Sequence, residues 1–381
     1  MKIVSFFSGA GGLDRGFEEA GFEVIWANEY DKSIWETYEK NFPNTVLDRR
    51  SIVDIDPQEV PDCDGIIGGP PCQSWSEAGA LRGIEDHRGQ LFFDYIRIIK
   101  EKKPKFFLAE NVSGILAGRH RDAFKNILNS FAELGYNVSY SLLNANDYDV
   151  PQDRQRVIIV GYEEKYGLFF NAPKKVKKKP TLKDAIHDLK ANVVAAGDKN
   201  RTNPKQKVVN HEFMTGGFST IFMSRNRVRP WDKPSFTIQA GGRHAPLHPQ
   251  APEMVTFGKN DKRFVEGYEH LYRRLSVREC ARVQTFPDSH IFYYTNIADG
   301  YKMIGNAVPV NLAKHLALQI KADLSSVKNT KKDNQSGVVK DYTKVAQVTL
   351  LQRQIKLTCN NYLKQIVSHH LPLHLMHAKM E

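Results

Sequence analysis

Cysteine is scarce in this sequence of 381 residues, which contains four: Cys63, Cys72, Cys280 and Cys359. No two of them form a C-x-x-C pair, and none stands at a spacing from histidine that suits zinc. The pattern therefore predicts neither a disulfide framework nor a metal site. It is typical of a protein from a reducing compartment.

Long hydrophobic runs are also missing. No segment approaches the roughly 18 apolar residues that a membrane-spanning helix needs, and the short apolar start gives way at once to Gly11 and Gly12. We expect a cytoplasmic protein with no membrane partner, and we expect it to be a monomer.

The sequence lacks a complete dinucleotide-binding fingerprint. The third glycine of G-x-G-x-x-G would fall at position 14, where Asp14 stands, and this counts against NAD. The glycine cluster at 7–12 can still form a tight turn that brings the backbone close to a ligand. Glu29 follows the next apolar run, where a carboxylate can accept hydrogen bonds from ribose hydroxyls. A solvated loop carboxylate is the alternative interpretation of Glu29.

Acidic residues are outnumbered, because 54 Lys and Arg face 43 Asp and Glu and the formal net charge is +11. Such an excess favours an anionic partner, either nucleic acid or a membrane surface. It is uneven, since residues 325–381 hold nine basic and three acidic residues. Net charge alone therefore does not identify the partner.

The order of apolar and amphipathic segments predicts an α/β fold. Apolar runs at 3–7, 24–27, 65–67, 106–109, 138–143 and 157–161 alternate with amphipathic stretches at 13–20, 33–41, 91–100 and 122–134. This alternation is typical of βα units, with helices on both faces of a mostly parallel sheet. We expect a first domain at 1–170, a loop-rich second domain at 171–273, a return to the first at 274–324 and a poorly ordered extension at 325–381.

A rigid loop with a cysteine follows the run at 65–67. It reads Gly69-Pro70-Pro71-Cys72, and it should lie at the carboxyl edge of the sheet, where α/β proteins bind their ligands. A lone cysteine is usually an inert core residue. Here two prolines stiffen the approach to the thiol, so we expect Cys72 to be displayed and reactive.

Two further groups stand beside predicted strands. Glu110 follows the run at 106–109, and Arg154 and Arg156 precede the run at 157–161. Each is ordinary surface sequence when taken singly. Their joint placement next to the loop of Cys72 favours a common site.

Together these blocks resemble the DNA (cytosine-5)-methyltransferase family over about residues 2–322. They occur in the family's order: F-S-G-A-G at 7–11, Glu29, P-P-C at 70–72, E-N-V at 110–112, Q-D-R-Q-R at 152–156, R-L-S-V-R-E at 274–279 and G-N-A-V-P at 305–309. The resemblance implies an S-adenosylmethionine-dependent methyltransferase fold, which is Rossmann-like. A mixed, mostly parallel sheet would carry a smaller loop-rich DNA-recognition domain.

The resemblance also implies a reaction. Cys72 would add to carbon 6 of a flipped cytosine, Glu110 would donate a proton toward ring nitrogen 3, and Arg154 and Arg156 would hold the base and its backbone. The cofactor would be S-adenosyl-L-methionine and the partner double-stranded DNA. A restriction endonuclease of the same bacterial cytoplasm would be linked to it by function and not by binding.

Several positions are predicted to bind the cofactor by the same resemblance: Phe7, Gly9, Gly11, Gly12, Leu13, Glu29, Ser51, Ile52, Pro70, Asn306 and Ala307. Ser51 departs from the family, which has an aspartate there that contacts the adenine amino group. Asp48 or Asp54 could compensate.

Residues predicted to contact DNA lie in two stretches: Ser76, Arg82 and Arg88 in a loop that closes over the duplex, and Arg225, Arg227 and Arg243 in the basic second domain. Arginine forks are the commonest specific contacts to guanine. The segments at 221–229 and 247–252 are similar to the HaeIII type of restriction-modification enzyme, which implies a GGCC target. The alternative is that the arginines only neutralise phosphates.

Two other functions compete with DNA methylation. A tRNA cytosine methyltransferase would share the catalytic blocks, although a long second domain favours DNA. A catalytically silent DNA-binding relative is the other, against which the intact Cys72, Glu110, Arg154 and Arg156 argue.

Overall fold

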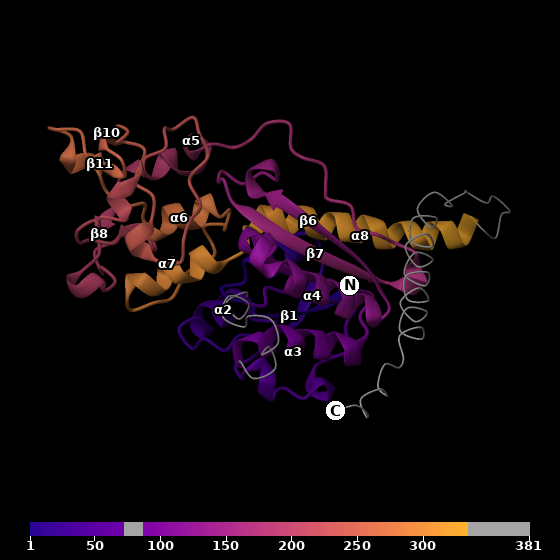
Figure 1. Cartoon of the computed structure of the whole chain (residues 1–381). Helices are drawn as coiled ribbons and strands as arrows, with labels where there is room; N and C mark the ends of the chain where they lie inside the picture. Colours follow the sequence, from indigo (N-terminus) through magenta and orange to yellow (C-terminus); the bar gives the residue numbers. More distant parts are fainter. Residues whose placement is uncertain (72–86, 334–381) are drawn as a thin grey trace, which may run out of the picture. The chain divides into compact units, whose positions relative to one another are not determined.

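The computed structural model describes residues 1–71 and 87–333. Met1–Ser325 forms one compact unit built on a seven-stranded sheet of order β3-β2-β1-β4-β5-β7-β6 (Figure 1). The strands are β1 (Lys2–Phe6), β2 (Glu23–Asn28), β3 (Val46–Asp48), β4 (Gly65–Gly68), β5 (Phe106–Val112), β6 (Tyr136–Asn144) and β7 (Gln155–Glu163). β1 to β5 are parallel, and β7 runs antiparallel to both β5 and β6. The predicted mixed, mostly parallel fold is confirmed.

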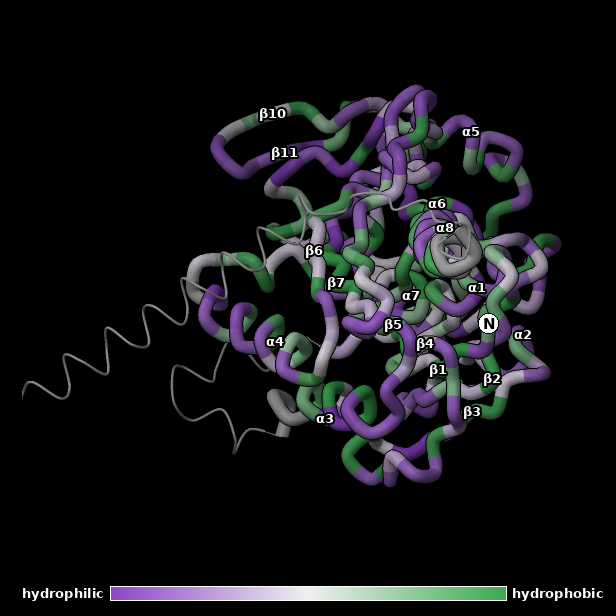
Figure 2. The backbone as a smooth tube through the Cα atoms, turned by 90° about the vertical axis from the view of Figure 1, so that its right-hand side faces the viewer, coloured by the Kyte–Doolittle hydropathy of each residue, from purple (hydrophilic) through white to green (hydrophobic). Residues whose placement is uncertain are grey.

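Alternate residues of the strands enter two separate cores, as the period of two requires. Ile3 and Leu108 lie in the core that α1 and α8 cover, whereas Val4 and Phe107 lie in the core under α3 and α4. Figure 2 shows α8 end-on, on the side of the sheet opposite α3 and α4. The helices around the sheet are α1 (Gly12–Glu19), α2 (Trp35–Asn41), α3 (His87–Lys102), α4 (Arg121–Glu133) and α8 (Val310–Asp333).

α1 and α8 pack closely because glycine stands at the contact. A Cβ atom on Gly16 would lie 2.4 Å from the Cβ of Ala313 and 2.5 Å from the carbonyl oxygen of Val310. Asp14, at the position that excluded the dinucleotide fingerprint, is buried and accepts hydrogen bonds from Ser5 and Tyr38, both at 2.6 Å. The first helix thus carries a buried polar group where the fingerprint would have a third glycine.

The region after β7 has little regular structure, and two further hydrophobic cores include its residues. Its elements are α5 (Leu182–Ile186), β8 (Val194–Ala195), β9 (Glu212–Phe213), β10 (Val255–Gly258), β11 (Asp261–Arg263), α6 (Val277–Val283) and α7 (Ile297–Asn306). One core joins α5, α6 and α7 and also includes Ala10 and Ile34 of the first domain. The other gathers Phe222, Val228 and Leu247. We call residues 171–273 the recognition region.

Helix ends in the part of the chain after residue 273 also follow local rules. Ser276 caps α6 by accepting from the backbone N–H of Glu279, whose carboxylate accepts from the N–H of Ser276 in return. α8 continues to Asp333, past residue 324, where the sequence predicts that the return to the first domain ends and a poorly ordered extension begins. Among the described residues, no helix is long and apolar enough to cross a membrane.

Candidate active site

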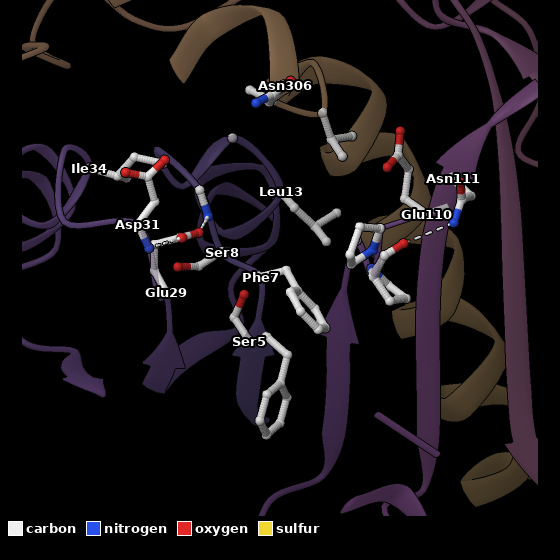
Figure 3. A pocket seen from close by; sticks show the side chains of 18 of the residues that line it. Ser5, Phe7, Ser8, Leu13, Glu29, Asp31, Ile34, Glu110, Asn111 and Asn306 are labelled. Atoms are coloured by element: carbon white, nitrogen blue, oxygen red, sulfur yellow. Dashed lines mark hydrogen bonds between the residues drawn. The ribbon is translucent and has the colours of Figure 1, made fainter. Parts of the chain in front are cut away.

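A cavity of about 510 Å³ opens where β1, β2, β4 and β5 end (Figure 3). Ligands of open α/β sheets bind at this carboxyl edge. Many of the predicted residues line the cavity: Phe7, Gly9, Gly12, Leu13, Glu29, Pro70, Glu110, Asn306 and Ala307. Figure 3 shows Glu29 and Asp31 on one side and Glu110 and Asn111 on the other, with Phe7 and Leu13 between them.

The turn after β1 has a backbone that favours glycine. Gly9 and Gly11 have φ angles of 55° and 79°, in the left-handed region, and Phe7 shares this conformation at 54°. A Cβ on Gly11 would lie 2.1 Å from the ring of Phe42, so this position must stay bare. In the described part of the chain Gly11 is not a lining residue. Gly11 packs against Phe42 and not against the cavity, which differs from its predicted role in binding the cofactor.

Glu29 ties this turn to the end of β2. Its Oε2 accepts from the backbone N–H of Gly9 at 2.9 Å, and its Oε1 accepts from the N–H of Asp31 at 2.7 Å. Burial raises the pKa of Glu29, and these two hydrogen bonds oppose that shift. The carboxylate is therefore fixed in place at the cavity wall.

Glu110 and Arg156 form an ion pair beside the cavity. Arg156 Nε lies 2.7 Å from Glu110 Oε1, and the two side chains are 12% and 11% exposed. They meet because β7 is antiparallel to β5, so its first residues stand at the carboxyl edge, with Arg156 opposite Val112. The carboxylate and the guanidinium are thus largely shielded from water and held together at the site.

Asn111 fixes the loop that leads to Cys72. Its Nδ2 donates to the carbonyl oxygen of Pro70 at 2.9 Å, and its Oδ1 accepts from the N–H of Val112 at 2.9 Å. Both bonds have the ordinary length for N–H···O contacts, and the residue is buried. The end of β5 therefore determines where the two prolines after β4 lie.

Arg154 does not reach the cavity. It is fully buried, and its guanidinium donates to the carbonyl oxygens of Ile238, Gly305 and Ala307 at 2.8–3.0 Å. Burial lowers its pKa. The expectation that Arg154 holds a base is corrected, because its donors are turned to carbonyls at the end of α7 and in the recognition region.

Ser51 and Ile52 also lie apart from the lining as the structure describes it. Ile52 packs in the core under α3, and its carbonyl oxygen accepts from Arg97 at 3.0 Å. Its side chain therefore does not face the cavity as predicted. Asp48, a candidate to compensate for Ser51, is paired with Arg50 at 2.6 Å, and this pairing lowers its pKa despite the opposing effect of burial.

Three predicted residues, Cys72, Ser76 and Arg82, lie outside the described residues. Arg88 falls within α3, but its side chain also lies outside what is described. The structure describes the loop of Cys72 up to Pro71, which lines the cavity.

The three predicted arginines of the recognition region divide into two kinds. Arg225 and Arg243 are exposed, whereas Arg227 is 6% exposed and donates to the carbonyl oxygens of Phe222 and Ile221. Burial, and then the charge of Arg225, lower the pKa of Arg227. A second cavity of about 210 Å³ joins the segments, and its lining includes Arg225, Arg227, Phe236, Gln239 and His244. Arg227 thus has two of its nitrogens committed to the fold, which corrects its assignment as a free fork.

The sequence matches one known protein family over most of its length. The model of the family described as C-5 cytosine-specific DNA methylase matches residues 1–322. The chain belongs to this family. Type II methyltransferase M.FnuDI from Fusobacterium nucleatum is 58% identical over 337 residues, which cover 87% of this chain and 98% of the relative. Type II methyltransferase M.BsuRI from Bacillus subtilis is 38% identical over 364 residues, covering 84% and 79%.

Solved structures share the fold of this methylase. A mutant of DNMT2 from Spodoptera frugiperda superposes with a TM-score of 0.62 at 18% identity, covering 84% of this chain and 99% of that one. The Entamoeba histolytica methyltransferase EhMeth gives 0.61 at 15% identity, covering 85% and 98%. At such identities the likeness supports the fold alone. The predicted enzyme class, a DNA (cytosine-5)-methyltransferase, is confirmed by the family.

Methylases of this family imply S-adenosylmethionine, and the cavity fits it. Ser8 Oγ is buried at the lining and has no hydrogen-bond partner among the described residues, so a polar ligand can satisfy it. Nothing lies within 4 Å of a Cβ built on Gly9, which leaves room beside the turn. Of the three carboxylates in the lining, Glu110 and Asp31 are paired with Arg156 and Lys302, and that of Glu29 has no ion pair among the described residues and suits a polar or cationic ligand. No cluster of side chains that could hold a metal occurs in the part of the methylase that is described.

Sequence reasoning missed some lining residues of the methylase. Ser8, Asp31, Ile34 and Asn111 all line the cavity but were not singled out. Asn111 belongs to the E-N-V block at 110–112 and Ser8 to the F-S-G-A-G block at 7–11, so the sequence contains a signal for both. Asp31 stands two residues after Glu29, and no motif marks it.

Proposed function

We propose that this methylase transfers a methyl group to carbon 5 of a cytosine within a specific duplex DNA site, with S-adenosyl-L-methionine as cofactor. The observation that carries the proposal is the ion pair of Glu110 and Arg156 at the edge of a cavity that Pro70 and Pro71 also line. Cys72 is the next residue of the chain. The arrangement brings a carboxyl group and a guanidinium to the place where a thiol follows.

Cys72 is the nucleophile in this proposal. Carbon 5 of cytosine reacts poorly until a group adds at carbon 6, and a thiolate is the best side-chain nucleophile near neutral pH. The sulfur forms a bond to carbon 6, and the electron pair of the double bond becomes available at carbon 5. After methylation, loss of the carbon 5 proton and expulsion of the sulfur restore the ring.

Glu110 and Arg156 stabilise the base during addition. Glu110, when it carries a proton, donates it toward ring nitrogen 3, where negative charge collects as the sulfur adds. Arg156 holds the carboxyl group of Glu110 in direction through the 2.7 Å contact. Since both groups are shielded from water, their interactions with the base are stronger than at an open surface.

The cofactor is held by the turn after β1 and by Glu29. When bound, S-adenosylmethionine supplies an electrophilic methyl group to carbon 5. Glu29 offers a fixed carboxylate to ribose hydroxyls, and Ser8 and Asn306 offer further polar contacts. Phe7, Leu13 and Ile34 supply apolar walls that exclude water from the site.

The target base must leave the duplex, because its carbon 6 is hidden in the stack. Ser76, Arg82 and Arg88 are proposed to contact DNA from the loop after Cys72. Arg225 and Arg243 are proposed to read guanines, and both are exposed. Relatives named Type II methyltransferases support a role in restriction-modification. The likeness of residues 221–229 and 247–252 to the HaeIII type motivates the further proposal of a GGCC site. We also propose a monomeric enzyme of the bacterial cytoplasm, with a nuclease linked only by function.

The decisive experiment incubates the protein with tritiated S-adenosylmethionine and a panel of duplexes that differ in sequence, with tRNA as the control substrate. We expect label in duplexes with GGCC, on the cytosine that bisulfite sequencing then identifies. The variant C72S should transfer no methyl group while binding the cofactor normally, because a hydroxyl lacks appreciable anion at neutral pH. Label in tRNA alone, or normal turnover by C72S, would refute the proposal.

A further inference from the structure

A two-stranded ribbon projects from the recognition region at its outer edge (Figures 1 and 2). β10 and β11 pair antiparallel, with Thr256 opposite Lys262. All four residues of β10 are exposed, including Val255 at 44% and Phe257 at 64%. Large apolar side chains on both sides of a polar residue in an exposed strand indicate a surface that contacts something else.

The ribbon is anchored at both of its feet. Met254, just before β10, is buried, and Phe264, just after β11, stacks on Tyr272 with ring centroids 4.1 Å apart. Both residues belong to the small core that includes Phe222 and Val228. The exposure of Phe257 therefore belongs to a ribbon held in place by its base.

The charge of the ribbon is positive. The ribbon contains three basic residues, Lys259, Lys262 and Arg263, and one acidic residue, Asp261. The carboxylate of Asp261 pairs with Arg263 at 3.1 Å. The guanidinium of Arg263 also lies over the ring of Phe257, 4.2 Å from its centroid. Lys262 bonds to Thr256 across the ribbon. The surface thus combines two lysines that form no ion pair among the described residues with an aromatic ring that a guanidinium covers.

We propose that this ribbon docks on the duplex outside the target site, in the groove that flanks it. β11 packs beside residues Phe222–Ser224, which lead directly into Arg225, so the ribbon adjoins the segment proposed to read bases. A two-stranded ribbon fits the major groove of DNA, and Lys259 at its tip and Lys262 on β11 can reach the phosphates on either side. Phe257 supplies apolar contact of the kind that thymine methyl groups accept.

The proposal rests on DNA being the substrate, and its test separates the two claims. Two duplexes carry the same target, one extending a helical turn beyond it on each side and one cut back to a few base pairs. The full-length variants are K259A/K262A and F257A. The matched control K2A/K100A removes two exposed lysines at the amino edge of the sheet and the end of α3.

We expect K259A/K262A to bind the long duplex about tenfold more weakly at moderate salt and to reduce the slope of log affinity against log salt by about two. F257A should weaken binding of the long duplex without changing that slope. Both variants should match the wild type on the short duplex and in methylation rate at saturating DNA, and the control should match it throughout.

Three results would overturn the assignment: unchanged affinity of both variants for the long duplex, equal loss on both duplexes, or a wild-type dimer that F257A converts to monomer in sedimentation. The last would make the ribbon an interface between copies of the chain. Failure of the proposed function would appear separately, as wild-type protein that methylates neither duplex.

Discussion

The side chain of Asn111 holds the carbonyl oxygen of Pro70 at 2.9 Å, so the end of one strand sets the position of the loop after its neighbour. The variant N111D keeps the acceptor for the N–H of Val112 but loses the donor to Pro70. We expect N111D to lower kcat by the factor that corresponds to about 1–3 kcal/mol of lost transition-state stabilisation. The reason is that the buried carbonyl oxygen of Pro70, two residues before Cys72, loses its hydrogen-bond donor.

Cofactor affinity should change little in N111D, since the turn after β1 and Glu29 are untouched. Single-turnover methylation and calorimetry measure the two effects separately. The exposed Asn126 of α4 provides the control variant N126A. Equal loss of cofactor affinity and of kcat would mean that Asn111 supports the whole cavity and not the loop alone.

Removal of the Glu29 carboxylate is expected to weaken cofactor binding. E29A should cost about 1–3 kcal/mol in the free energy of S-adenosylmethionine binding, because ribose hydroxyls would be left without an acceptor. E23A, at the exposed opposite end of β2, is the matched control and should leave binding unchanged.

Restoring the family's aspartate at position 51 tests the adenine contact. S51D is expected to tighten cofactor binding, since a longer acidic side chain can reach the adenine amino group that Ser51 leaves free. Calorimetry at constant salt measures the affinity of E29A and of S51D for S-adenosylmethionine. An unaltered affinity in E29A would remove Glu29 from the cofactor site, and an unaltered affinity in S51D would do the same for position 51.

The recognition arginines should separate into readers and supports. R225A and R243A are expected to cost about 1–3 kcal/mol of discrimination, each at one base pair, because a guanidinium fork to guanine is lost. R227A should instead lower the free energy of unfolding, because its side chain binds two backbone carbonyls within the region.

Bisulfite sequencing of randomised duplexes and thermal unfolding distinguish the two groups. Alanine substitution of the exposed Lys177 and Lys178 is the control, and it should weaken binding of all DNA sequences alike. Uniform loss across sites for R225A and R243A would mean that they touch only phosphates. The GGCC assignment would then lose its residue-level support.

Asp14 makes stability depend on pH. Burial raises its pKa from the ordinary 3.8 to about 6, against the hydrogen bonds from Ser5 and Tyr38. The folded state therefore holds the proton more tightly than the unfolded state. This contribution is complete below the unfolded pKa and is lost as pH rises through the folded value, on the order of 3 kcal/mol in all.

The variant D14N cannot ionise, so it should gain stability relative to the wild type as pH rises from about 4 to about 7. Denaturant unfolding at several pH values measures the difference, with the exposed D122N on α4 as the control. Parallel pH profiles for wild type and D14N would show that Asp14 stays ionised when the protein folds.

The sequence could predict the cavity because its residues follow consecutive strands. Glu29 directly follows β2, Pro70 comes two residues after β4, and Glu110 lies near the carboxyl end of β5. Parallel strands bring such positions to one edge. The direction of β7 could not be predicted in the same way, since an apolar strand carries no mark of its orientation. Arg156 reaches Glu110 only because β7 runs antiparallel.

The sequence pattern wrongly predicts Arg154 as a site residue for a related reason. It stands two positions before Arg156, and regular alternation would place both on one face. Arg154 precedes the strand, however, and its three acceptors belong to residues 238, 305 and 307, which only the tertiary fold brings near. Local pattern contains no information about such distant carbonyls.

The place of α8 gives the growing polypeptide a vulnerable interval. Leu312, Leu316 and Ile320 cover the same face of the sheet as Ile3 and Leu108, yet they are synthesised long after β7 has left the ribosome. At the usual pace of translation, the delay amounts to roughly 10–30 s. During that time the part of this face that α1 does not cover is exposed to water, so newly made protein should be a client of chaperones until the last helix is synthesised.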